Sequence, residues 1–351
     1  MPSFTFTPTW PEPEPTSVII EPGALEGLPR IVASLGEQYV PTILYDVGIA
    51  PVAERIARAL ETASLMSVES GDASKSLSSV ERIVAEMLAA GCGRQTVLIV
   101  VGGGMLTDLG GFIASTFMRG IPFILVPTTS LAMIDAAIGG KTAVNVRGRK
   151  NMLGTIAEPR AIVADIDLLL SLPEKQYREG LVEAVKIAAI ADAELFEWME
   201  AHLDGVLHRN PNLVTEFVSR SVALKLEITK EDLMDEDVRL LLNFGHTIGH
   251  AVEALMQYTI SHGDAVSIGM ALEMELAAFP DRDRILVLLH KLGTPTMLPS
   301  SGLISAEALW RIMLTDKKNV DGEVRMSVPD GIGTGMVEVI DPDRFKILLQ
   351  Q

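Results

Sequence analysis

Short runs of aliphatic and β-branched residues alternate with helical stretches through the first half of the chain. Strands are predicted at 17–20, 42–45, 65–68, 96–101 and 123–126, and helical periodicity fills 51–62 and 78–90 between them. Strands that alternate with helices at this spacing are typical of a parallel sheet with crossover helices. We therefore expect an α/β domain over residues 17–170.

The second half has a different pattern, because strand signals nearly stop at about residue 170. Segments with a 3.6-residue apolar repeat are predicted to be helices at 176–202, 211–230, 238–257, 264–278 and 281–292. A last pair of short strands is predicted at 325–328 and 336–339. Residues 171–351 should thus form a mainly helical domain, and residues 1–16, rich in Pro and Glu, an extended arm.

Composition and charge narrow the class of protein. A chain of 351 residues is longer than one hydrophobic core usually serves, which favours two domains. The 29 Lys and Arg against 46 Asp and Glu give a net charge of −17, which repels nucleic acids and anionic membrane surfaces. Cys92 is the single cysteine, no apolar run is long enough to span a bilayer, and the N-terminus lacks the pattern of a secretory signal. We therefore expect a cytoplasmic protein.

A glycine-rich loop follows the strand predicted at 96–101. That strand runs directly into three glycines, 102–104, and helical sequence comes next. Strand, glycine turn and helix together let backbone N–H groups and a helix N-terminus approach a pyrophosphate, although the spacing is not G-x-G-x-x-G. The alternative is a tight turn that needs glycine for its φ angles. Thr128 and Thr129, at the end of the next predicted strand, favour a nucleotide site.

Three of the six histidines lie within 17 residues. On one continuous helix, at about 100° per residue, four polar side chains would share a stripe about 60° wide: Arg239, Asn243, His246 and His250. His262 follows where another helix should begin. Two or three imidazoles with a carboxylate suit Zn²⁺, and spacing alone favours His246, His250 and His262 as ligands. Satisfied core histidines are the alternative.

Glu183 and Lys186 form a second polar group in an apolar segment. They lie three residues apart among Leu, Val, Ile and Ala, where an unpaired buried charge would cost several kcal/mol. One interpretation is that Glu183 is a metal-binding carboxylate. The other is that the two residues form an internal ion pair.

Several cations lie in glycine-rich or apolar sequence, which is unusual for solvated charges. They are Lys141, Lys150, Lys186, Lys225, Arg239, Lys317 and Lys318. A small substrate that carries both a phosphate and a carboxylate would need such a cluster within an acidic protein. Ordinary surface charge is the alternative for each residue taken alone.

Taken together, these motifs resemble those of the 3-dehydroquinate synthase family, the sugar phosphate cyclases. The N-terminal motifs are Gly102-Gly103-Gly104 with Asp108, Arg119-Gly120, Pro127-Thr128-Thr129 with Leu131 and Asp135, and Gly139-Gly140-Lys141-Thr142. The C-terminal motifs are Lys150-Asn151, Glu183 with Lys186, Asn243 with Gly245-His246 and Gly249-His250, His262-Gly263 and Asp316-Lys317-Lys318. The match runs in order, with near-constant spacing, over about residues 40–335.

The resemblance implies a Rossmann-like NAD-binding domain followed by a helical domain for metal and substrate. It implies that Zn²⁺ or Co²⁺ is held by Glu183, His246 and His262, with His250 handling protons nearby. NAD would contact Asp46, Asp72, Lys75, Gly103, Gly104, Asp108, Thr128, Thr129 and Leu131. Catalysis and substrate binding would fall to Asp135, Lys141, Lys150, Asn151, Lys186, Lys225, Arg239, Asn243, His250 and one of Lys317 and Lys318. Arg119 would reach across the interface of a homodimer to the phosphate in the neighbouring subunit.

The activity implied is that of a carbon–oxygen lyase acting on a small phosphorylated sugar acid, 3-deoxy-D-arabino-heptulosonate 7-phosphate. Transient oxidation by NAD acidifies a C–H bond, phosphate leaves by β-elimination, the hydride returns, and an intramolecular aldol addition closes the ring of 3-dehydroquinate in the shikimate pathway. Two segments, 154–159 and 232–238, depart from the family pattern without removing a matched ligand.

Three alternatives to this activity stay open. One is another sugar phosphate cyclase, acting on the amino analogue or on sedoheptulose 7-phosphate. The second is a metal- and NAD-dependent polyol dehydrogenase, which would produce NADH in net amounts. The third is an inactive scaffold or ligand sensor with the same fold.

Overall fold

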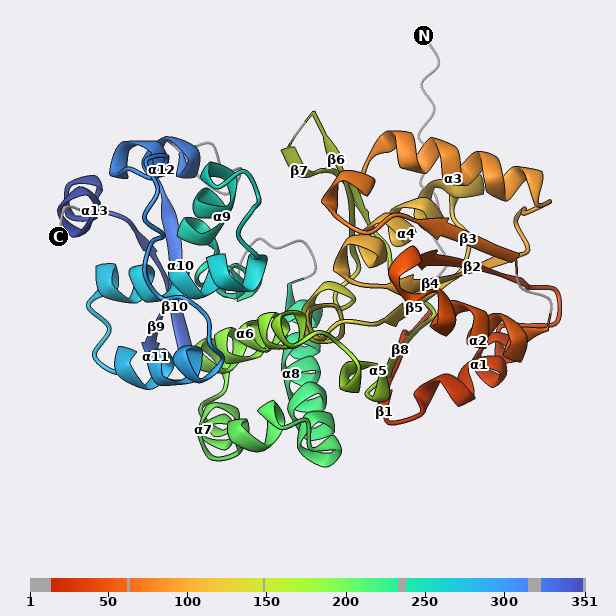
Figure 1. Cartoon of the computed structure of the whole chain (residues 1–351), viewed down its shortest axis with the longest axis horizontal. Helices are drawn as coiled ribbons and strands as arrows, with labels where there is room; N and C mark the ends of the chain where they lie inside the picture. Colours follow the sequence, from red (N-terminus) through yellow and green to blue (C-terminus); the bar gives the residue numbers. More distant parts are fainter. Residues whose placement is uncertain (1–13, 62–63, 148, 233–237, 315–322, 350–351) are drawn as a thin grey trace, which may run out of the picture.

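The computed structural model of the chain describes residues 14–61, 64–147, 149–232, 238–314 and 323–349. Its central element is a wholly parallel six-stranded sheet with the order β1-β8-β5-β4-β2-β3 (Figure 1). The strands are β1 (Ser17–Glu21), β2 (Val40–Asp46), β3 (Ser64–Val68), β4 (Thr96–Gly102), β5 (Phe123–Pro127) and β8 (Ala161–Asp165). Five of them confirm predicted strands, and β8 is missing from the prediction.

Helices cover both faces of this sheet (Figure 1). They are α1 (Leu28–Ser34), α2 (Ala50–Leu60), α3 (Leu77–Ala89) and α4 (Gly104–Thr116). In β4, the side chains of Val97, Ile99 and Val101 pack in one apolar cluster with α1 and α2, and those of Leu98 and Val100 pack in another with α3 and α4. Because β4 is buried on both faces, its sequence is a continuous apolar run. The predicted α/β fold of the first half of the chain is therefore confirmed.

In the described part of the second half, the regular elements are helices and one hairpin. Its helices are α5 (Asp167–Leu170), α6 (Glu174–Ala191), α7 (Ala193–Leu207), α8 (Pro211–Glu231), α9 (His246–Leu255), α10 (His262–Ala277), α11 (Arg282–Lys291), α12 (Ala306–Met313) and α13 (Pro342–Leu348). The hairpin pairs β9 (Arg325–Gly331) with β10 (Thr334–Val339), as predicted. Figure 1 shows α9 to α13 gathered around this hairpin, while α6 to α8 connect it to the sheet. The helices predicted at 211–230, 264–278 and 281–292 are confirmed as α8, α10 and α11.

The single helix predicted at 176–202 is wrong. Asp192 has extended backbone angles and separates α6 from α7. Its carboxylate accepts a hydrogen bond from the N–H of Leu195 at 2.9 Å, which caps the second helix. An aspartate that caps a helix in this way competes with the uninterrupted apolar repeat, and here the cap prevails.

The helix predicted at 238–257 is also interrupted. Val238–Asn243 forms a 3-10 segment, Gly245 has a left-handed φ of +78°, and α9 begins only at His246. The angular stripe that placed Arg239 on one face with the histidines is therefore wrong, because the helix on which it depends is not continuous. A left-handed residue suits glycine, which has no Cβ to clash with the backbone.

Helix α10 holds α9 at this starting point. The buried carboxylate of Glu273 accepts hydrogen bonds from the N–H groups of Gly245, at 2.5 Å, and Ile248, at 3.0 Å. A Cβ on Gly269 would lie 1.9 Å from the carbonyl oxygen of Gly245, so any side chain at this position of α10 would clash with the backbone just before α9. These contacts with α10 set the position of the N-terminus of α9, where His246 lies.

An antiparallel hairpin of β6 (Lys141–Val146) and β7 (Arg149–Ile156) is missing from the prediction. Much of β7 is exposed, so the alternation that marks a half-buried strand is weak there. The hairpin packs closely on α4, since a Cβ on Gly111 would lie 2.6 Å from Cγ2 of Thr142. It carries predicted site residues toward the second half of the chain.

Two expectations about the whole chain can be compared with the structure. Of the predicted N-terminal arm, residues 14–16 have no regular secondary structure, and residues 1–13 lie outside the described part. No helix in the described ranges is long and apolar enough to cross a membrane.

Candidate active site

Three ligand-type side chains meet where α6, α9 and α10 converge. Glu183 lies in the middle of α6, whereas His246 and His262 are the first residues of α9 and α10. Oε1 of Glu183 lies 3.2 Å from Nε2 of His262 and 3.8 Å from Nε2 of His246. One ligand atom from each of the three lies within 4.8 Å of the others. Two imidazoles and a carboxylate at this spacing fit a divalent ion that keeps a position open.

The carboxylate of Glu183 is buried without well-aligned donors. The residue is 1% exposed, and neither oxygen has a hydrogen bond of good geometry from the described residues. Lys186 forms an ion pair with Oε2. Burial raises the pKa of Glu183, but Lys186 and His262 outweigh burial and hold this pKa below its ordinary value. A buried, ionised carboxylate with free lone pairs is a group that a metal ion satisfies.

His262 lies between two carboxylates, one of which the sequence analysis missed. Its Nε2 faces Glu183, and its Nδ1 lies 3.5 Å from Oε2 of Glu253 on α9. Burial lowers the pKa of His262, but the two carboxylates beside its ring raise it to about 10. Glu253 follows His250 by three residues in apolar sequence, which is the same kind of signal that singled out Glu183.

His250 stands beside this cluster. It is exposed, and its ring centroid lies 5.0 Å from that of His246 and 5.9 Å from that of His262. Within the described ranges, the groups spaced for a metal are Glu183 with His246 and His262, and His250 with Glu253 and His262. The three-histidine set favoured by spacing alone is not one of these groups, since each of them includes a buried carboxylate beside His262.

The glycine-rich loop joins β4 to α4 at the carboxyl end of the sheet. Gly103 has a φ of −76°, and glycines 102–104 are all outside the left-handed region. The alternative that these glycines serve a strained turn is therefore wrong. They permit close approach instead, since a Cβ on Gly104 would lie 2.9 Å from Cβ of Ala136, and one on Gly103 would lie 3.3 Å from Cγ2 of Thr129.

Other residues expected to contact NAD lie at neighbouring strand ends. The N–H of Thr128, directly after β5, donates to the carbonyl of Gly102 at 3.0 Å. Leu131 follows in the same loop. Asp46 ends β2, which pairs with β4, and its carboxylate accepts hydrogen bonds from the Gly48 N–H and the Ser70 hydroxyl. The parallel sheet thus brings these residues to one edge.

Hairpin β6–β7 meets the sheet through a buried lysine. Nζ of Lys75 lies 2.5 Å from Oδ2 of Asp108 and 2.5 Å from Oδ1 of Asn151 on β7. Burial raises the pKa of Asp108, against the lowering effect of Lys75. The next residue back along β7, Lys150, pairs with Asp72 at 3.1 Å. The structure therefore joins two predicted cofactor residues to two predicted substrate residues.

Two further predicted cations, Lys225 and Arg239, lie where the two halves of the chain meet. Nζ of Lys225 on α8 lies 2.6 Å from Oδ1 of Asp135, which belongs to a π-helical turn (Ala132–Ala136) after β5. Burial lowers the pKa of Lys225 in spite of Asp135. The guanidinium of Arg239 donates to the carbonyl of Gly139 at 3.1 Å. Asn243, on the same 3-10 segment as Arg239, donates to the carbonyl of Leu240 at 2.9 Å.

Comparison with known proteins accounts for this set of residues. Residues 65–179 match the family model for the 3-dehydroquinate synthase N-terminal region, and residues 180–319 match the model for its C-terminal region. The chain belongs to the 3-dehydroquinate synthase family. It is 37% identical over 340 residues to a curated 3-dehydroquinate synthase of Xylella fastidiosa, which covers 92% of this chain and 91% of that protein. The family resemblance drawn from the motifs is thus confirmed.

Solved structures place the fold among other sugar phosphate cyclases. The chain superposes with a TM-score of 0.87 and 28% identity on 2-epi-5-epi-valiolone synthase of Streptomyces hygroscopicus, solved with NAD⁺ and Zn²⁺ bound, over 98% of both chains. A second match is 2-deoxy-scyllo-inosose synthase, solved with carbaglucose-6-phosphate, NAD⁺ and Co²⁺, with a TM-score of 0.83 and 26% identity over 95% of both chains.

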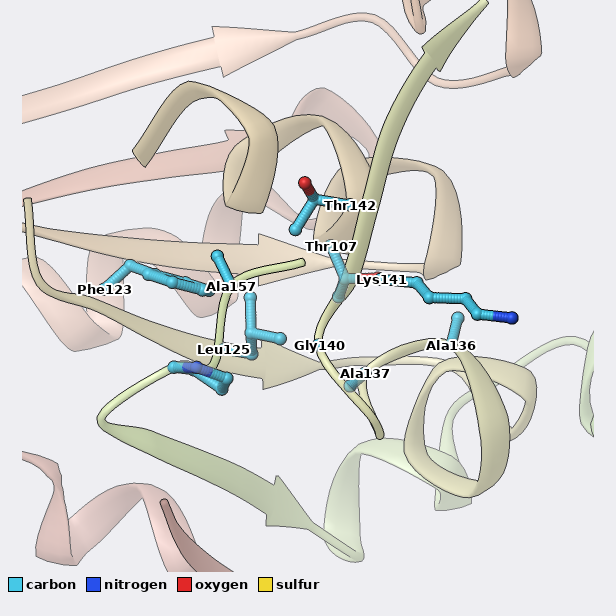
Figure 2. A pocket seen from close by; sticks show the side chains of 10 residues that line it. Thr107, Phe123, Leu125, Ala136, Ala137, Gly140, Lys141, Thr142 and Ala157 are labelled. Carbon is cyan, nitrogen blue, oxygen red and sulfur yellow. The ribbon is translucent and has the colours of Figure 1, made fainter. Parts of the chain in front are cut away.

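In this member of the 3-dehydroquinate synthase family, the remaining predicted residues lie elsewhere in the first half of the chain or outside the described residues. Arg119 follows the C-terminal end of α4, so a 13-residue helix of about 20 Å separates it from the glycine loop. Lys141 begins β6 beside a small pocket with room for about one water molecule. Figure 2 shows its amine pointing away from Phe123 and Leu125, which line that pocket. Lys317 and Lys318 lie outside the described residues.

Proposed function

We propose that this protein is a 3-dehydroquinate synthase, which converts 3-deoxy-D-arabino-heptulosonate 7-phosphate into 3-dehydroquinate and phosphate. The observation that carries the proposal is the convergence of Glu183, His246 and His262 in a chain of this family. Both halves of the chain contain buried cations, and Lys186 pairs with Glu183 itself, as a substrate with two anionic groups requires.

The residues present fit a divalent metal ion. We propose that Glu183, His246 and His262 hold Zn²⁺ or Co²⁺, the ions named for the two solved cyclases. Two nitrogen ligands and one oxygen ligand suit either ion, and a buried carboxylate without aligned donors supports such a role.

The glycine loop fits NAD. Helix α4 begins at Gly104 without a capping bond from a described side chain, and the glycines before it leave room for close backbone approach. An uncapped helix N-terminus at a strand end attracts a pyrophosphate. We propose that Gly103, Gly104, Thr128 and Thr129 line the cofactor, with Asp46, Asp72, Lys75, Asp108 and Leu131 around it.

Bound NAD supplies a hydride acceptor and donor, and the metal ion supplies polarisation of substrate oxygens. The chain's own residues then bind and orient the substrate. We propose that Lys225 and Arg239 hold its anionic groups, because both cationic side chains are buried and each contacts the segment that follows β5. Lys141, Lys150, Asn151, Asn243 and one of Lys317 and Lys318 would complete the substrate contacts. Because these charged side chains are already in position before the reaction, they can stabilise the transition state without first having to move.

Proton movement falls to residues beside the metal cluster. His250 is exposed and close to both ligand imidazoles, so it can exchange a proton with solvent. Lys186 is buried beside Glu183 and neutralises its charge. We propose that His250 carries protons to and from the substrate. We also propose that Lys186 and Asp135 hold their charges in fixed positions beside the bound substrate.

We further propose a functional division near residue 170. Residues 17–170 would bind NAD and, through hairpin β6–β7, part of the substrate, whereas residues 171–351 would bind the metal and the rest of the substrate. Arg119, at the far end of α4, would act on the neighbouring subunit of a homodimer located in the cytoplasm. Light scattering during gel filtration tests the dimer, and mixing an Arg119→Ala subunit with an inactive Lys225→Met subunit should restore activity if sites are shared.

One experiment decides the activity. The purified protein is incubated with the seven-carbon phosphorylated acid, NAD and Zn²⁺, while free phosphate and NADH absorbance are followed and the product is identified by NMR. Phosphate release without lasting NADH, together with 3-dehydroquinate, is expected. Stoichiometric NADH would instead identify a dehydrogenase. Removal of the metal by a chelator, or the Glu183→Gln substitution, should abolish turnover and metal binding together.

A second candidate function is another sugar phosphate cyclase, which the similarity to the two solved cyclases favours. Parallel reactions with sedoheptulose 7-phosphate and glucose 6-phosphate separate these candidates. The presence of Arg239, Asn243 and His250, which match the dehydroquinate type, supports the first proposal. Turnover of either sugar phosphate at a higher kcat/KM than the acid would favour the second.

A further inference from the structure

Glu253 is a buried carboxylate that the proposed mechanism does not use. It lies on α9, seven residues after His246, and is 4% exposed. Oε2 lies 3.5 Å from Nδ1 of His262, and Oε1 lies 3.6 Å from Nζ of Lys150. Each carboxylate oxygen therefore faces one positively polarised group.

The contact with His262 has a consequence for the imidazole ring. The two ring nitrogens face two different carboxylates, because Nε2 lies 3.2 Å from Glu183 while Nδ1 faces Glu253. A neutral imidazole has one N–H donor and one lone pair. If Nδ1 carries the proton and donates it to Glu253, the lone pair is left on Nε2, which points to the metal cluster.

The second oxygen connects Glu253 to the other half of the chain. Lys150 extends from hairpin β6–β7, pairs with Asp72, and lies 4.2 Å from the ring centroid of Tyr258. The carboxylate is thus held by a cation on one side, which limits the rotamers in which it can face His262.

We propose that Glu253 is a positioning residue that orients His262, through its Nδ1–H group, for metal binding by Nε2. The inference rests on the metal site proposed above. Loss of an outer carboxylate of this kind typically weakens metal binding by about 10- to 100-fold, because the ligand ring loses its preferred tautomer and orientation.

The test measures metal affinity directly, without turnover. Zn²⁺ affinity is determined by competition with a chromophoric chelator for the full-length wild type, Glu253→Gln and Glu253→Ala, and the absorption spectrum of the Co²⁺-loaded proteins reports ligand geometry. Glu253→Ala should bind Zn²⁺ about 10- to 100-fold more weakly and alter the Co²⁺ spectrum. Glu253→Gln should lie in between, because its amide oxygen still accepts a hydrogen bond from Nδ1.

Two controls separate this role from a general loss of structure. Glu275→Gln makes the same chemical change on α10, where the side chain is half exposed and pairs with Arg282, and should leave Zn²⁺ affinity unchanged. Lys150→Met removes the cation that holds Glu253 and should weaken Zn²⁺ binding by much less than Glu253→Ala does, because the carboxylate is still present beside His262. Circular dichroism and the unfolding midpoint show whether each variant is folded.

The outcomes are distinct for the inference and for the metal site on which it rests. If the wild type binds no stoichiometric Zn²⁺, or if Glu183→Gln retains it, the proposed metal site is wrong. If the wild type binds one equivalent and a folded Glu253→Ala binds it equally tightly, the metal site stands and the role of Glu253 is refuted. A loss in Lys150→Met as large as that in Glu253→Ala would also refute it, since the effect would then act through the hairpin.

Discussion

Helix α6 packs against the loop after β5 so closely that one methyl group should disturb both stability and cofactor binding. An ideal Cβ on Gly180 would lie 2.1 Å from the backbone nitrogen of Leu131 and 2.2 Å from Oγ of Ser130. That hydroxyl donates to the carbonyls of Gln176, at 2.9 Å, and Tyr177, at 2.8 Å. Gly180→Ala must therefore push a backbone segment away from the helix by about 1 Å to reach ordinary contact.

The expected magnitude combines three effects. Overpacking against backbone costs about 1–3 kcal/mol, and weakening of the Ser130 hydrogen bonds costs about 0.5–1.5 kcal/mol. Higher helix propensity of alanine offsets about 1 kcal/mol. We expect Gly180→Ala to lower the free energy of unfolding by about 0.5–3.5 kcal/mol. Because the displaced loop carries Thr128, Thr129 and Leu131, we also expect NAD to bind about tenfold more weakly, which corresponds to about 1.4 kcal/mol.

Gly205→Ala is the matched control. Gly205 lies in α7, and its Cβ would meet only the end of the half-buried Leu213 side chain, at 2.3 Å, which can rotate aside. This variant should change stability by less than about 1 kcal/mol and leave NAD affinity unaltered. Chemical denaturation and fluorescence titration with NAD measure both quantities. If Gly180→Ala matches Gly205→Ala in both, the close docking of α6 on this loop is not a constraint and the reasoning fails.

Three further predictions concern charge and hydrogen bonding. Lys225→Met should lower stability at neutral pH by about 1–2 kcal/mol, because it leaves the partly exposed Asp135 without its ion pair. Burial raises the pKa of Asp135, but Lys225 outweighs burial and holds this pKa below its ordinary value. The difference in stability between wild type and Lys225→Met should therefore be fully present above pH 4 and narrow as Asp135 is protonated at lower pH. A stability difference that does not change with pH would contradict this prediction. The carboxylates raise the pKa of His262 to about 10, so below that pH a proton competes with the metal for this imidazole. Zn²⁺ affinity should therefore rise about tenfold per pH unit near neutrality. Calorimetry in two buffers should show that binding releases about one proton. Tyr177→Phe removes the hydroxyl that donates to the carbonyl of Val206 at 2.7 Å. The free energy of unfolding should fall by about 1–3 kcal/mol, with turnover unchanged. A variant as stable as wild type would show that this buried hydrogen bond contributes nothing to stability.

The sequence alone was enough to predict the parallel sheet, most of the helices and the family, whereas the spacing of the histidines did not group Glu183 with His246 and His262. Strands such as β4 are buried on both faces, so their apolar runs are short, continuous and bounded by turns. Glu183 and Lys186 stood out in the sequence because burying an unpaired charge in an apolar helix is costly. Such signals are local, since they depend on the burial of one element and not on which element covers it.

The tertiary structure alone decided how these elements meet. Lys225 reaches Asp135 across 90 residues of chain, and Lys75 reaches Asn151 across 76. The start of α9 depends on Glu273 of another helix, which is why the apolar repeat wrongly continued through Gly245. Periodicity records which residues are buried, whereas the position of a helix end and the partner of a buried charge depend on packing between segments that are distant in sequence.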